Sequence, residues 1–372
     1  MKKQKVYVLI GPPASGKSTY AKKLLKKKNT KIISSDVIRI LNGFELNQTA
    51  ETFKIYYDNF KQYLKEGYNV ILDSTNISLK HRHIIFDILE TEFEDKFNSG
   101  QIEVIAVVIN TSRERCIQQL DARNKTNYFY KIPISAIDKY ISMFQMPLLS
   151  EGFSKRILAH KCTLKDKIRL RKNIKRAFKF VHNDRYHGNE TYKEHIEKVL
   201  LNSNAYYYFM REKYKTSPYV IHKSILLHDY GKFLTVRQSE KDPDKNSYKN
   251  HANFGAWDYI SHISTKKFIN ESVIIFIMNY HMYLSTGILP KKAKYYLKSE
   301  ELYEMLRTFD IADKEPYEIQ DNWFWIFWKY NKTLFRKRNS WRMERGRLGF
   351  WCSWLYRNSF TRIRCKNNFI SR

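Results

Sequence analysis

Cysteine is scarce in this chain of 372 residues, and no two cysteines form a Cys-x-x-Cys pair: they are Cys116, Cys162, Cys352 and Cys365. This scatter argues against a disulfide scaffold and favours a reducing compartment, so we expect a cytoplasmic protein. Long apolar runs are missing too, since no stretch approaches the ~18 residues that a membrane-spanning helix needs. The opening Met1-Lys2-Lys3 leads directly into a short apolar run, so we expect no secretion signal.

Acidic residues are few: 37 Asp and Glu oppose 67 Lys and Arg, which gives a net charge of +30 and a pI of about 9.7. An excess of this size predicts a polyanionic partner, most simply nucleic acid. A lysine-rich source proteome explains it equally well, because 45 of the basic residues are lysine. The hydrophobic content of 43% is sufficient for more than one core, and the length predicts one to three domains.

Residues 11–18 fit the pattern G-x-x-x-x-G-K-[ST]. They follow an apolar run at 6–10 that predicts a buried strand, and they precede apolar residues at helical spacing. Strand, glycine loop and helix together predict a phosphate-binding loop, in which backbone N–H groups and the helix N-terminus hold anionic oxygens. Lys17 is then expected to reach the β- and γ-phosphates, and Ser18 to hold Mg²⁺. The nucleotide-binding candidates are Gly11, Pro12, Pro13, Ala14, Ser15, Gly16, Lys17, Ser18 and Thr19.

Two further apolar runs end in an acid, at Asp36 and at Asp73. In an open α/β sheet the carboxyl ends of the strands line the ligand crevice. Asp36 is therefore placed to take a proton from an acceptor hydroxyl, and Arg39 to bind a substrate phosphate. Asp73 is placed like a Walker-B acid beside Mg²⁺. The alternatives are a helix N-cap at Asp36 and a turn acid at Asp73.

Four alternations of strand and helix in residues 1–152 predict an α/β domain with a parallel sheet and flanking helices. A basic helical segment with Arg113, Arg115 and Arg123 follows the last strand, and Lys131 lies shortly after it. Such a segment suits a lid that brings positive charge onto a phosphoryl group, although a solvated face is the better reading for Arg113 and Arg115.

These residues resemble the P-loop domain of phage and bacterial polynucleotide 5′-kinases. The matching motifs are residues 11–18, Asp36-x-x-Arg39, Asp73-x-Thr75-Asn76, and Arg123-Asn124 leading to Lys131-x-Pro133. The resemblance implies ATP and Mg²⁺ as cofactors, Asp36 as the general base and Arg39 as the contact to the acceptor's phosphate. It implies that Arg123 contacts the donor phosphates. Lys131 stands near the place where the family often has a second lid arginine.

Residues 153–176 are crowded with Lys and Arg, and only Asp166 opposes them. We expect a basic linker, which either tracks a phosphodiester backbone or is simply solvated.

Beyond the linker, an ordered set of histidines and acids predicts a metal site. His195 lies in one helical pattern, and the adjacent pair His228-Asp229 ends an apolar helix. Imidazole together with carboxylate suits Mn²⁺, Fe, Ni²⁺ or Zn²⁺. For any single histidine the alternative is a hydrogen-bonded imidazole without a metal. The candidate ligands are His195, His228, Asp229, His251, His281 and Asp310, with Asp313 as the second choice for the last position.

This set resembles the HD phosphohydrolase superfamily, an all-helical, metal-dependent fold, so we expect an all-α HD domain over residues 177–322. The resemblance implies a divalent transition metal such as Mn²⁺, Ni²⁺ or Zn²⁺, with His251 and His281 matching two-metal members. It also implies that Lys232 lies near the scissile phosphate and that His187 contacts substrate.

Together the two resemblances imply a bifunctional enzyme of a bacterial cell or a phage-infected host that heals nucleic-acid ends. It would phosphorylate 5′-OH ends of RNA or DNA and remove 3′-phosphates or open 2′,3′-cyclic phosphates, after which a ligase could seal the ends. Known fusions usually carry the HD module first, whereas this chain has the reverse order. The alternatives are a small-molecule or nucleoside kinase joined to an HD nucleotide phosphohydrolase, and a non-catalytic nucleic-acid-binding protein.

Residues 323–372 differ in composition from the rest, since six of the seven tryptophans and only one acid lie there. A stacking surface for nucleic acid and a partner-binding helix are two explanations. We favour a third, translation in a shifted reading frame from near Trp323.

Overall fold

The computed structural model describes residues 3–26, 28–126, 131–183 and 189–314. His187 and the atypical segment 323–372 lie outside the described residues, so the expectations for them stay predictions. Among the described residues, every helix is too short or too polar to cross a bilayer.

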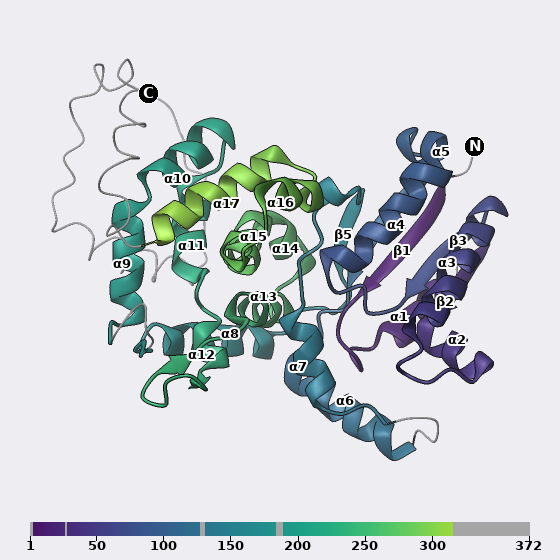
Figure 1. Ribbon diagram of the computed structural model, residues 1–372, viewed down its shortest axis with the longest axis horizontal. Helices are drawn as coiled ribbons and strands as arrows, with labels where there is room; N and C mark the ends of the chain where they lie inside the picture. Colours follow the sequence, from purple (N-terminus) through teal and green to yellow (C-terminus); the bar gives the residue numbers. More distant parts are fainter. Residues whose placement is uncertain (1–2, 27, 127–130, 184–188, 315–372) are drawn as a thin grey trace, which may run out of the picture. The chain divides into compact units, whose positions relative to one another are not determined.

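A five-stranded sheet organises the N-terminal half of residues 1–313 (Figure 1). The strands run in the order β2-β3-β1-β4-β5, and every neighbouring pair is parallel. Their carboxyl ends therefore meet at one edge, where an open α/β sheet binds its ligands. The strands are β1 (Gln4–Ile10), β2 (Thr30–Ser34), β3 (Asn69–Asp73), β4 (Ile102–Val108) and β5 (Lys155–Leu158).

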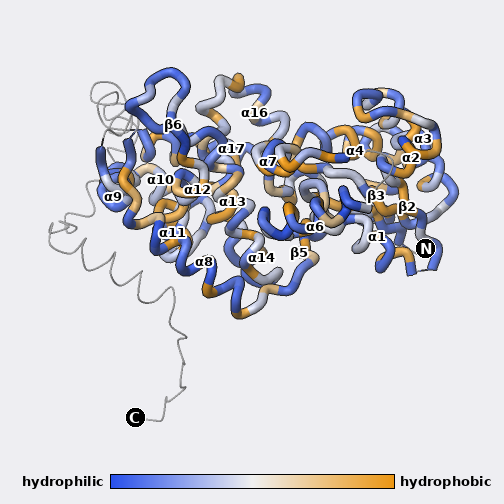
Figure 2. Tube along the Cα trace, turned by 90° about the horizontal axis from the view of Figure 1, so that it is seen from below, coloured by the Kyte–Doolittle hydropathy of each residue, from blue (hydrophilic) through white to orange (hydrophobic). Residues whose placement is uncertain are grey.

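Both faces of this sheet are buried. Successive side chains of β1 point to opposite sides of the sheet, and each side packs in a hydrophobic cluster. Val6 and Val8 belong to the larger hydrophobic cluster, whereas Tyr7 and Leu9 pack in a smaller cluster that includes Leu24 of α1. The larger cluster continues into the C-terminal half, so one core serves both halves. Figure 2 shows hydrophobic residues along β2 and β3. The helices of this half are α1 (Lys17–Leu25), α2 (Ser35–Asn42), α3 (Thr49–Lys65), α4 (Leu79–Glu92), α5 (Glu94–Asn98), α6 (Arg113–Thr126) and α7 (Ser135–Ser142), with the 3₁₀ turn η1 (Leu149–Glu151).

The expected parallel sheet with flanking helices is confirmed. The expected linker at 153–176 is corrected, because this segment contains β5 and most of the helix α8 (Leu164–Ala177). β5 adds an edge strand beside β4, pairing Val108 with Leu158. The charge run concealed both elements because α8 exposes its basic residues and buries only Leu170, Ile174 and Ala177.

The C-terminal half is helical, as expected, apart from one short two-stranded ribbon. Its helices surround α13 and α15, which pack against each other and against α7 and α11 respectively (Figure 1). The elements are α9 (Tyr192–Asn202), α10 (Asn204–Tyr208), the π-helix η2 (Phe209–Lys213), α11 (Pro218–Leu227), α12 (Lys232–Thr235), β6 (Arg237–Gln238), β7 (Asn246–Ser247), α13 (His251–Ser261), α14 (Thr265–Asn270), α15 (Ser272–Tyr280), η3 (Leu284–Thr286), α16 (Pro290–Leu297) and α17 (Glu300–Asp313).

Buried polar contacts join the two halves just after α7. The carbonyl oxygen of Phe144 accepts hydrogen bonds from the amides of Asn253 on α13, at 2.6 Å, and Asn279 on α15, at 3.0 Å. The Asn279 side chain also accepts from the backbone N–H of Met146 at 2.6 Å, and the Tyr280 hydroxyl donates to the Met146 carbonyl at 2.9 Å. Because these groups are buried, each bond is costly to break. The segment that follows α7 is thus fixed to α13 and α15.

Candidate functional site

The glycine loop lies between β1 and α1, as its sequence predicts. Gly16 takes φ of 97° at the N-cap of α1, a left-handed conformation that favours glycine. Lys17 is folded back over the loop, where its ammonium group donates to the carbonyl oxygens of Gly11 at 3.1 Å and Pro12 at 2.8 Å. Burial lowers the pKa of Lys17, and the nearby carboxylates of Asp73 and Asp36 oppose this effect. The loop is therefore formed around a cation that can meet the phosphates of a nucleotide.

Asp73, the last residue of β3, is buried beside this loop. Burial raises the pKa of its carboxyl group, while the charge of Lys17 and a hydrogen bond from the Ser18 side chain act in the opposite direction. A serine hydroxyl and a carboxylate at this place are the two groups by which P-loop proteins hold Mg²⁺. The structure thus brings Ser18 and Asp73 together as their spacing predicted.

Asp36 lies in the first turn of α2, directly after β2, with two guanidinium groups near its carboxylate. Arg123 of α6 donates to Asp36 at 3.3 Å, and Arg39 lies 4.0 Å from the other oxygen. The Asp36 side chain is 43% exposed, so a substrate hydroxyl can reach it. The N-cap of α2 is Ser34, whose side chain accepts from the N–H of Val37. The capping alternative for Asp36 therefore does not hold.

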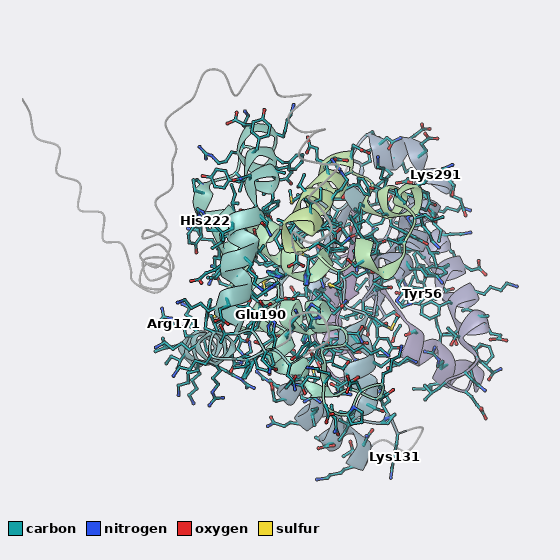
Figure 3. The ribbon with its side chains drawn as sticks, turned by 60° about the vertical axis from the view of Figure 1, so that its left-hand side comes forward. Tyr56, Lys131, Arg171, Glu190, His222 and Lys291 are labelled. Atoms are coloured by element: carbon teal, nitrogen blue, oxygen red, sulfur yellow. The ribbon has the colours of Figure 1, made fainter. Side chains whose placement is uncertain are left out.

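The expected lid begins with α6, and the segment that leads from it to α7 is held at Ile132 by the side-chain amide of Asn124. Asn124 donates to the carbonyl oxygen of Ile132 at 2.8 Å and accepts from the N–H of Ile132 at 3.2 Å. Lys131 lies next to this clamp, and its side chain extends outward at the edge of the molecule in Figure 3. Its place as a second lid cation beside the nucleotide stays a prediction. Arg113 makes a two-pronged ion pair with Asp138 of α7, which agrees with a structural rather than a substrate-binding part.

A series of polar contacts that the sequence did not predict lies behind the glycine loop. The Thr111 hydroxyl donates to the carbonyl oxygen of Ser15 at 2.6 Å and lies 2.7 Å from His160 Nε2. Asn110 accepts from the N–H of His160 at 2.9 Å and donates to the carbonyl oxygen of Ile260 on α13 at 3.2 Å. The pair Asn110-Thr111 lies one residue beyond the end of β4, and this position at a strand's carboxyl end was the available signal.

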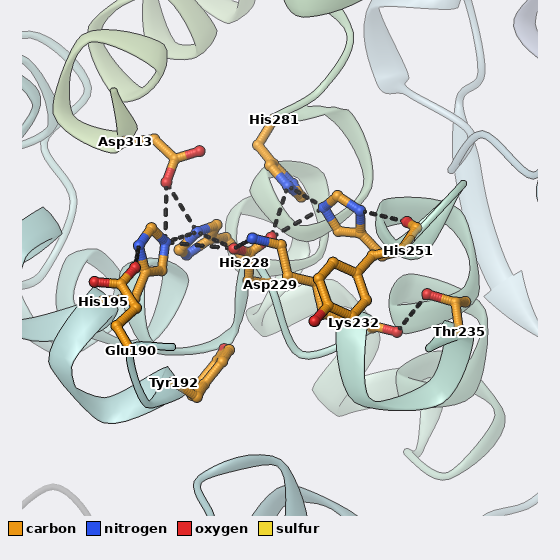
Figure 4. Close-up of polar contacts among 12 residues, drawn as sticks. Glu190, Tyr192, His195, His228, Asp229, Lys232, Thr235, His251, His281 and Asp313 are labelled. Carbon is orange, nitrogen blue, oxygen red and sulfur yellow. Dashed lines mark hydrogen bonds and ion pairs between the residues drawn. The ribbon is translucent and has the colours of Figure 1, made fainter. Parts of the chain in front are cut away.

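In the helical half, two histidines and two carboxylates meet in the interior (Figure 4). The Nε2 atoms of His195, on α9, and His228, at the end of α11, lie 3.2 Å apart. The Asp313 carboxylate lies 3.3 Å from the first and 3.0 Å from the second. Asp229 Oδ2 lies 3.3 Å from both. Four donor atoms thus converge on one point, which is the arrangement that a divalent cation needs.

A second set shares Asp229 with the first. Asp229 Oδ1 lies 2.9 Å from His251 Nε2 and 3.4 Å from His281 Nε2, and these two nitrogens are 3.0 Å apart. The two oxygens of one carboxylate therefore face different imidazole pairs, so Asp229 would be shared if each set held a cation. Lys232 Nζ lies 2.7 Å from Asp229 Oδ2, and its expected contact with the scissile phosphate stays a prediction.

The orientation of the histidines provides a test of whether this set fits a metal. Nδ1 of His228 faces the carbonyl oxygen of Ile225 at 2.7 Å, and Nδ1 of His251 faces that of Tyr248 at 2.9 Å. His281 Nδ1 likewise faces two backbone carbonyls of α15. A carbonyl only accepts, so Nδ1 must carry the proton, and each Nε2 lone pair points into the centre. The residues fit a divalent transition metal.

The charge of the centre supports the same conclusion. Burial opposes a charged His195, but the hydrogen bonds that its ring donates to Asp229, Asp313 and Glu190 outweigh this effect and raise its pKa to about 11. Burial also opposes a charged His228, whose pKa the carboxylates of Asp229 and Asp313 raise to about 9. Two buried carboxylates thus demand positive charge among the imidazoles, and a divalent cation supplies it.

Asp310 is not part of either donor set, so the first choice for the last ligand is wrong and the second choice, Asp313, takes its place. Both acids lie on α17, three residues and therefore about 4.5 Å apart along the axis. Asp310 lies about one turn before the end of α17, where it accepts a hydrogen bond from the Ser285 hydroxyl at 3.0 Å. Only Asp313, the last residue of the helix, reaches the level of His195.

Two residues that the sequence reading did not single out shape this centre. Gly231 lies against the start of α13, where a Cβ atom would come within 1.9 Å of the carbonyl oxygen of His251. This close approach sets the distance between the Asp229 turn and the helix that carries His251. Glu190 faces the Nδ1 atom of His195 at 3.4 Å and pairs with Lys198.

Residues 6–147 match a family model described as an AAA domain. A bifunctional polynucleotide phosphatase/kinase of Schizosaccharomyces pombe is 27% identical over 151 residues, covering 41% of this chain and 32% of that protein. A protein of Arabidopsis thaliana named transcription factor bHLH140 is 28% identical over 157 residues, which is 41% of this chain and 16% of that protein. The N-terminal half is a kinase-like P-loop domain. It is related in sequence to a polynucleotide kinase.

Two solved structures were also similar. A chain of the Pnkp1/Rnl/Hen1 RNA repair complex is 25% identical with a TM-score of 0.33, covering 38% of this chain and 44% of that chain. A fungal RNA kinase is 17% identical with a TM-score of 0.33, covering 42% of this chain and 76% of that chain. The chain spans about a sixth and a third of the length of the two curated relatives, and the family match ends before the histidine centre begins.

Proposed function

We propose that this chain is a bifunctional enzyme that heals nucleic-acid ends. Its P-loop half would transfer the γ-phosphoryl group of ATP to a 5′-OH end of RNA or DNA. Its helical half would be an HD-type phosphohydrolase that removes a 3′-phosphate or opens a 2′,3′-cyclic phosphate. The observation that carries the first activity is the convergence of Lys17, Asp73 and Asp36 on one edge of the sheet.

In the kinase reaction each of these residues has a separate task. Lys17 and the loop N–H groups would hold the donor phosphates, and Ser18 and Asp73 would hold Mg²⁺, which would supply positive charge to the transferring group. Asp36 accepts the proton of the 5′-hydroxyl, and Arg123, 3.3 Å away, orients that carboxylate and offers its remaining N–H groups to the phosphoryl oxygens. Arg39 is placed to bind the phosphate next to the 5′ end.

The kinase proposal is tested with an oligonucleotide bearing 5′-OH and 3′-phosphate ends, with ATP and Mg²⁺. Lys17→Ala and Asp36→Asn should each lower 5′ phosphorylation at least about 100-fold, the loss typical of a general base or a charge-stabilising group. Asp58→Asn is the matched control, because Asp58 is exposed on α3 away from the sheet edge. An Asp36→Asn variant as active as this control would contradict the assignment.

The phosphohydrolase proposal depends on the two donor sets that share Asp229. When bound, the cations would polarise a phosphoryl oxygen and lower the pKa of a water molecule. The chain's own residues have two further tasks. The hydrogen bonds at Nδ1 fix the imidazole rings of His228 and His251, and Lys232 places a positive charge beside the Asp229 carboxylate, which both donor sets share. Burial of His195, His228 and Asp229 keeps bulk water from the centre.

His228→Ala and Asp229→Ala should abolish the 3′ reaction and leave 5′ phosphorylation unchanged. EDTA followed by Mn²⁺, Ni²⁺ or Zn²⁺ identifies the metal that restores activity. His222→Ala is the matched control, since His222 lies on the same helix but in neither donor set. If one substitution removes both activities in a folded protein, the proposal of two separate sites is wrong.

Two other functions make different predictions. A small-molecule kinase joined to a nucleotide phosphohydrolase should act independently of oligonucleotide length, whereas a polynucleotide enzyme should weaken steeply as salt rises. A non-catalytic nucleic-acid-binding protein should show neither activity, so Lys17→Ala would change nothing. The basic charge and the relation to a polynucleotide kinase favour the end-healing enzyme, with an RNA or DNA ligase as a partner in the same pathway.

A further inference from the structure

A cavity of about 480 Å³ lies between the lid-side helices α6 and α7 and the elements α12, α13 and the β6–β7 ribbon. Its wall includes Lys139 of α7, Arg237 of β6, Lys249 and Asn250 of the turn before α13, and Trp257 of α13. A volume of this order is that of a ligand site. It belongs to neither of the two centres described above.

The acids in this wall already have partners. Asp138 is paired with Arg113, Glu114 accepts from Arg169 at 2.7 Å, and Asp258 accepts from the Tyr230 hydroxyl at 2.6 Å. Two of the three acids are thus paired with a guanidinium group, and the third accepts a hydrogen bond from a hydroxyl.

The exposed cations Lys139, Arg237 and Lys249, in contrast, make no ion pair with any residue in the described part of the chain. The cavity therefore presents three uncompensated positive charges, which attract an anionic ligand.

The second observation concerns Trp257. This side chain is only 1% exposed, yet its Nε1–H has no hydrogen-bond partner among the described residues. A buried donor without a partner is costly, and because the Nε1 atom has almost no accessible surface, this N–H is enclosed by packed protein rather than open to the cavity. The ring itself is held in place by an edge contact with Phe144.

The position of the cavity indicates which anion it takes. In its wall, Asn250 directly precedes the ligand candidate His251, and Thr235 is the last residue of the helix that begins at Lys232. The wall therefore adjoins the histidine centre. Arg113, also in the wall, begins the helix that carries Arg123 to the kinase centre, about 15 Å further along its axis. The cavity thus lies beside the histidine centre and at the start of the helix that leads to the kinase centre.

We propose that the cavity binds a backbone phosphate of the polynucleotide, internal to its ends. Lys139, Arg237 and Lys249 neutralise the phosphodiester. This inference rests on the proposed function for its choice of a nucleic acid, and it adds a contact that both reactions would share.

The test is direct binding of internally labelled single strands of three and twelve nucleotides, by fluorescence anisotropy over a range of salt. The variant Arg237→Glu/Lys249→Glu should bind the twelve-mer at least about 10-fold more weakly, and its slope of log K against log salt should fall by about 1. The trinucleotide should be affected less. Lys291→Glu/Lys292→Glu on α16 is the matched control, because it changes the net charge equally at exposed lysines outside the cavity.

The inference is overturned if the cavity variant behaves as the α16 variant. It is also overturned if inorganic phosphate or a mononucleotide at millimolar concentration displaces the twelve-mer from the wild type, which would indicate a small-anion site. A protein that binds the twelve-mer through this cavity but modifies neither end would refute the proposed function instead.

Discussion

Replacing Asp313 by Asn tests the histidine centre most directly. Asp313 supplies one of four donors and one of two negative charges to the set with His195 and His228, at 3.3 and 3.0 Å. Loss of a group that only orients a ligand already costs about 10–100-fold in metal affinity. Loss of a donor itself should cost at least about 100-fold, or ~2.7 kcal/mol at 25 °C.

The assay is calorimetric titration of metal-free protein with Mn²⁺, together with the rate of 3′-phosphate release. Because the second set does not include Asp313, one binding event should weaken and the other should stay nearly unchanged. Asp310→Asn is the matched control, on the same helix one turn earlier, and should change metal affinity by less than about threefold. The 5′ kinase activity of both variants serves as the check on folding.

The result that would refute the reasoning is the reverse order: weak binding in Asp310→Asn and normal binding in Asp313→Asn. Equal loss in both variants, with the kinase activity intact, would show that α17 is displaced as a whole and that neither carboxylate acts as a donor by itself.

Three further predictions concern the frame that supports the sites. Arg82→Leu should lower the free energy of unfolding in urea by about 3–5 kcal/mol, because Arg82 is fully buried and its loss leaves the Glu151 carboxylate uncompensated; Arg82→Leu/Glu151→Leu should recover part of the loss, and no recovery would argue against the pair. Gly231→Ala should cost at least about 3 kcal/mol, because its Cβ atom would meet backbone at 1.9 Å; a normal melting temperature would contradict that packing. Asn124→Ala removes both bonds to Ile132 and should lower kinase kcat about tenfold while the 3′ reaction stays normal; equal loss of both rates would point to misfolding.

Much of this protein followed from local sequence. The glycine loop, the apolar runs and the acids at their ends specified a parallel α/β sheet with Asp36 and Asp73 at one edge, because strand direction alone fixes where the carboxyl ends lie. The order of His195, His228, Asp229, His251 and His281 likewise identified residues that the fold brings together.

The tertiary structure decided what depends on distance across the chain. Whether Asp310 or Asp313 faces His195 is a matter of one helical turn, and helix position along its axis is set by packing rather than by any local pattern. The strand within the expected linker, Lys155–Leu158, forms because it can pair with β4 at the edge of the sheet, and this pairing is not visible in the local sequence. The cavity beside α13 is lined by residues from six separate helices and strands, and its charge balance depends on which acids have partners. Sequence determines the chemistry that is available, whereas packing determines which groups share a site.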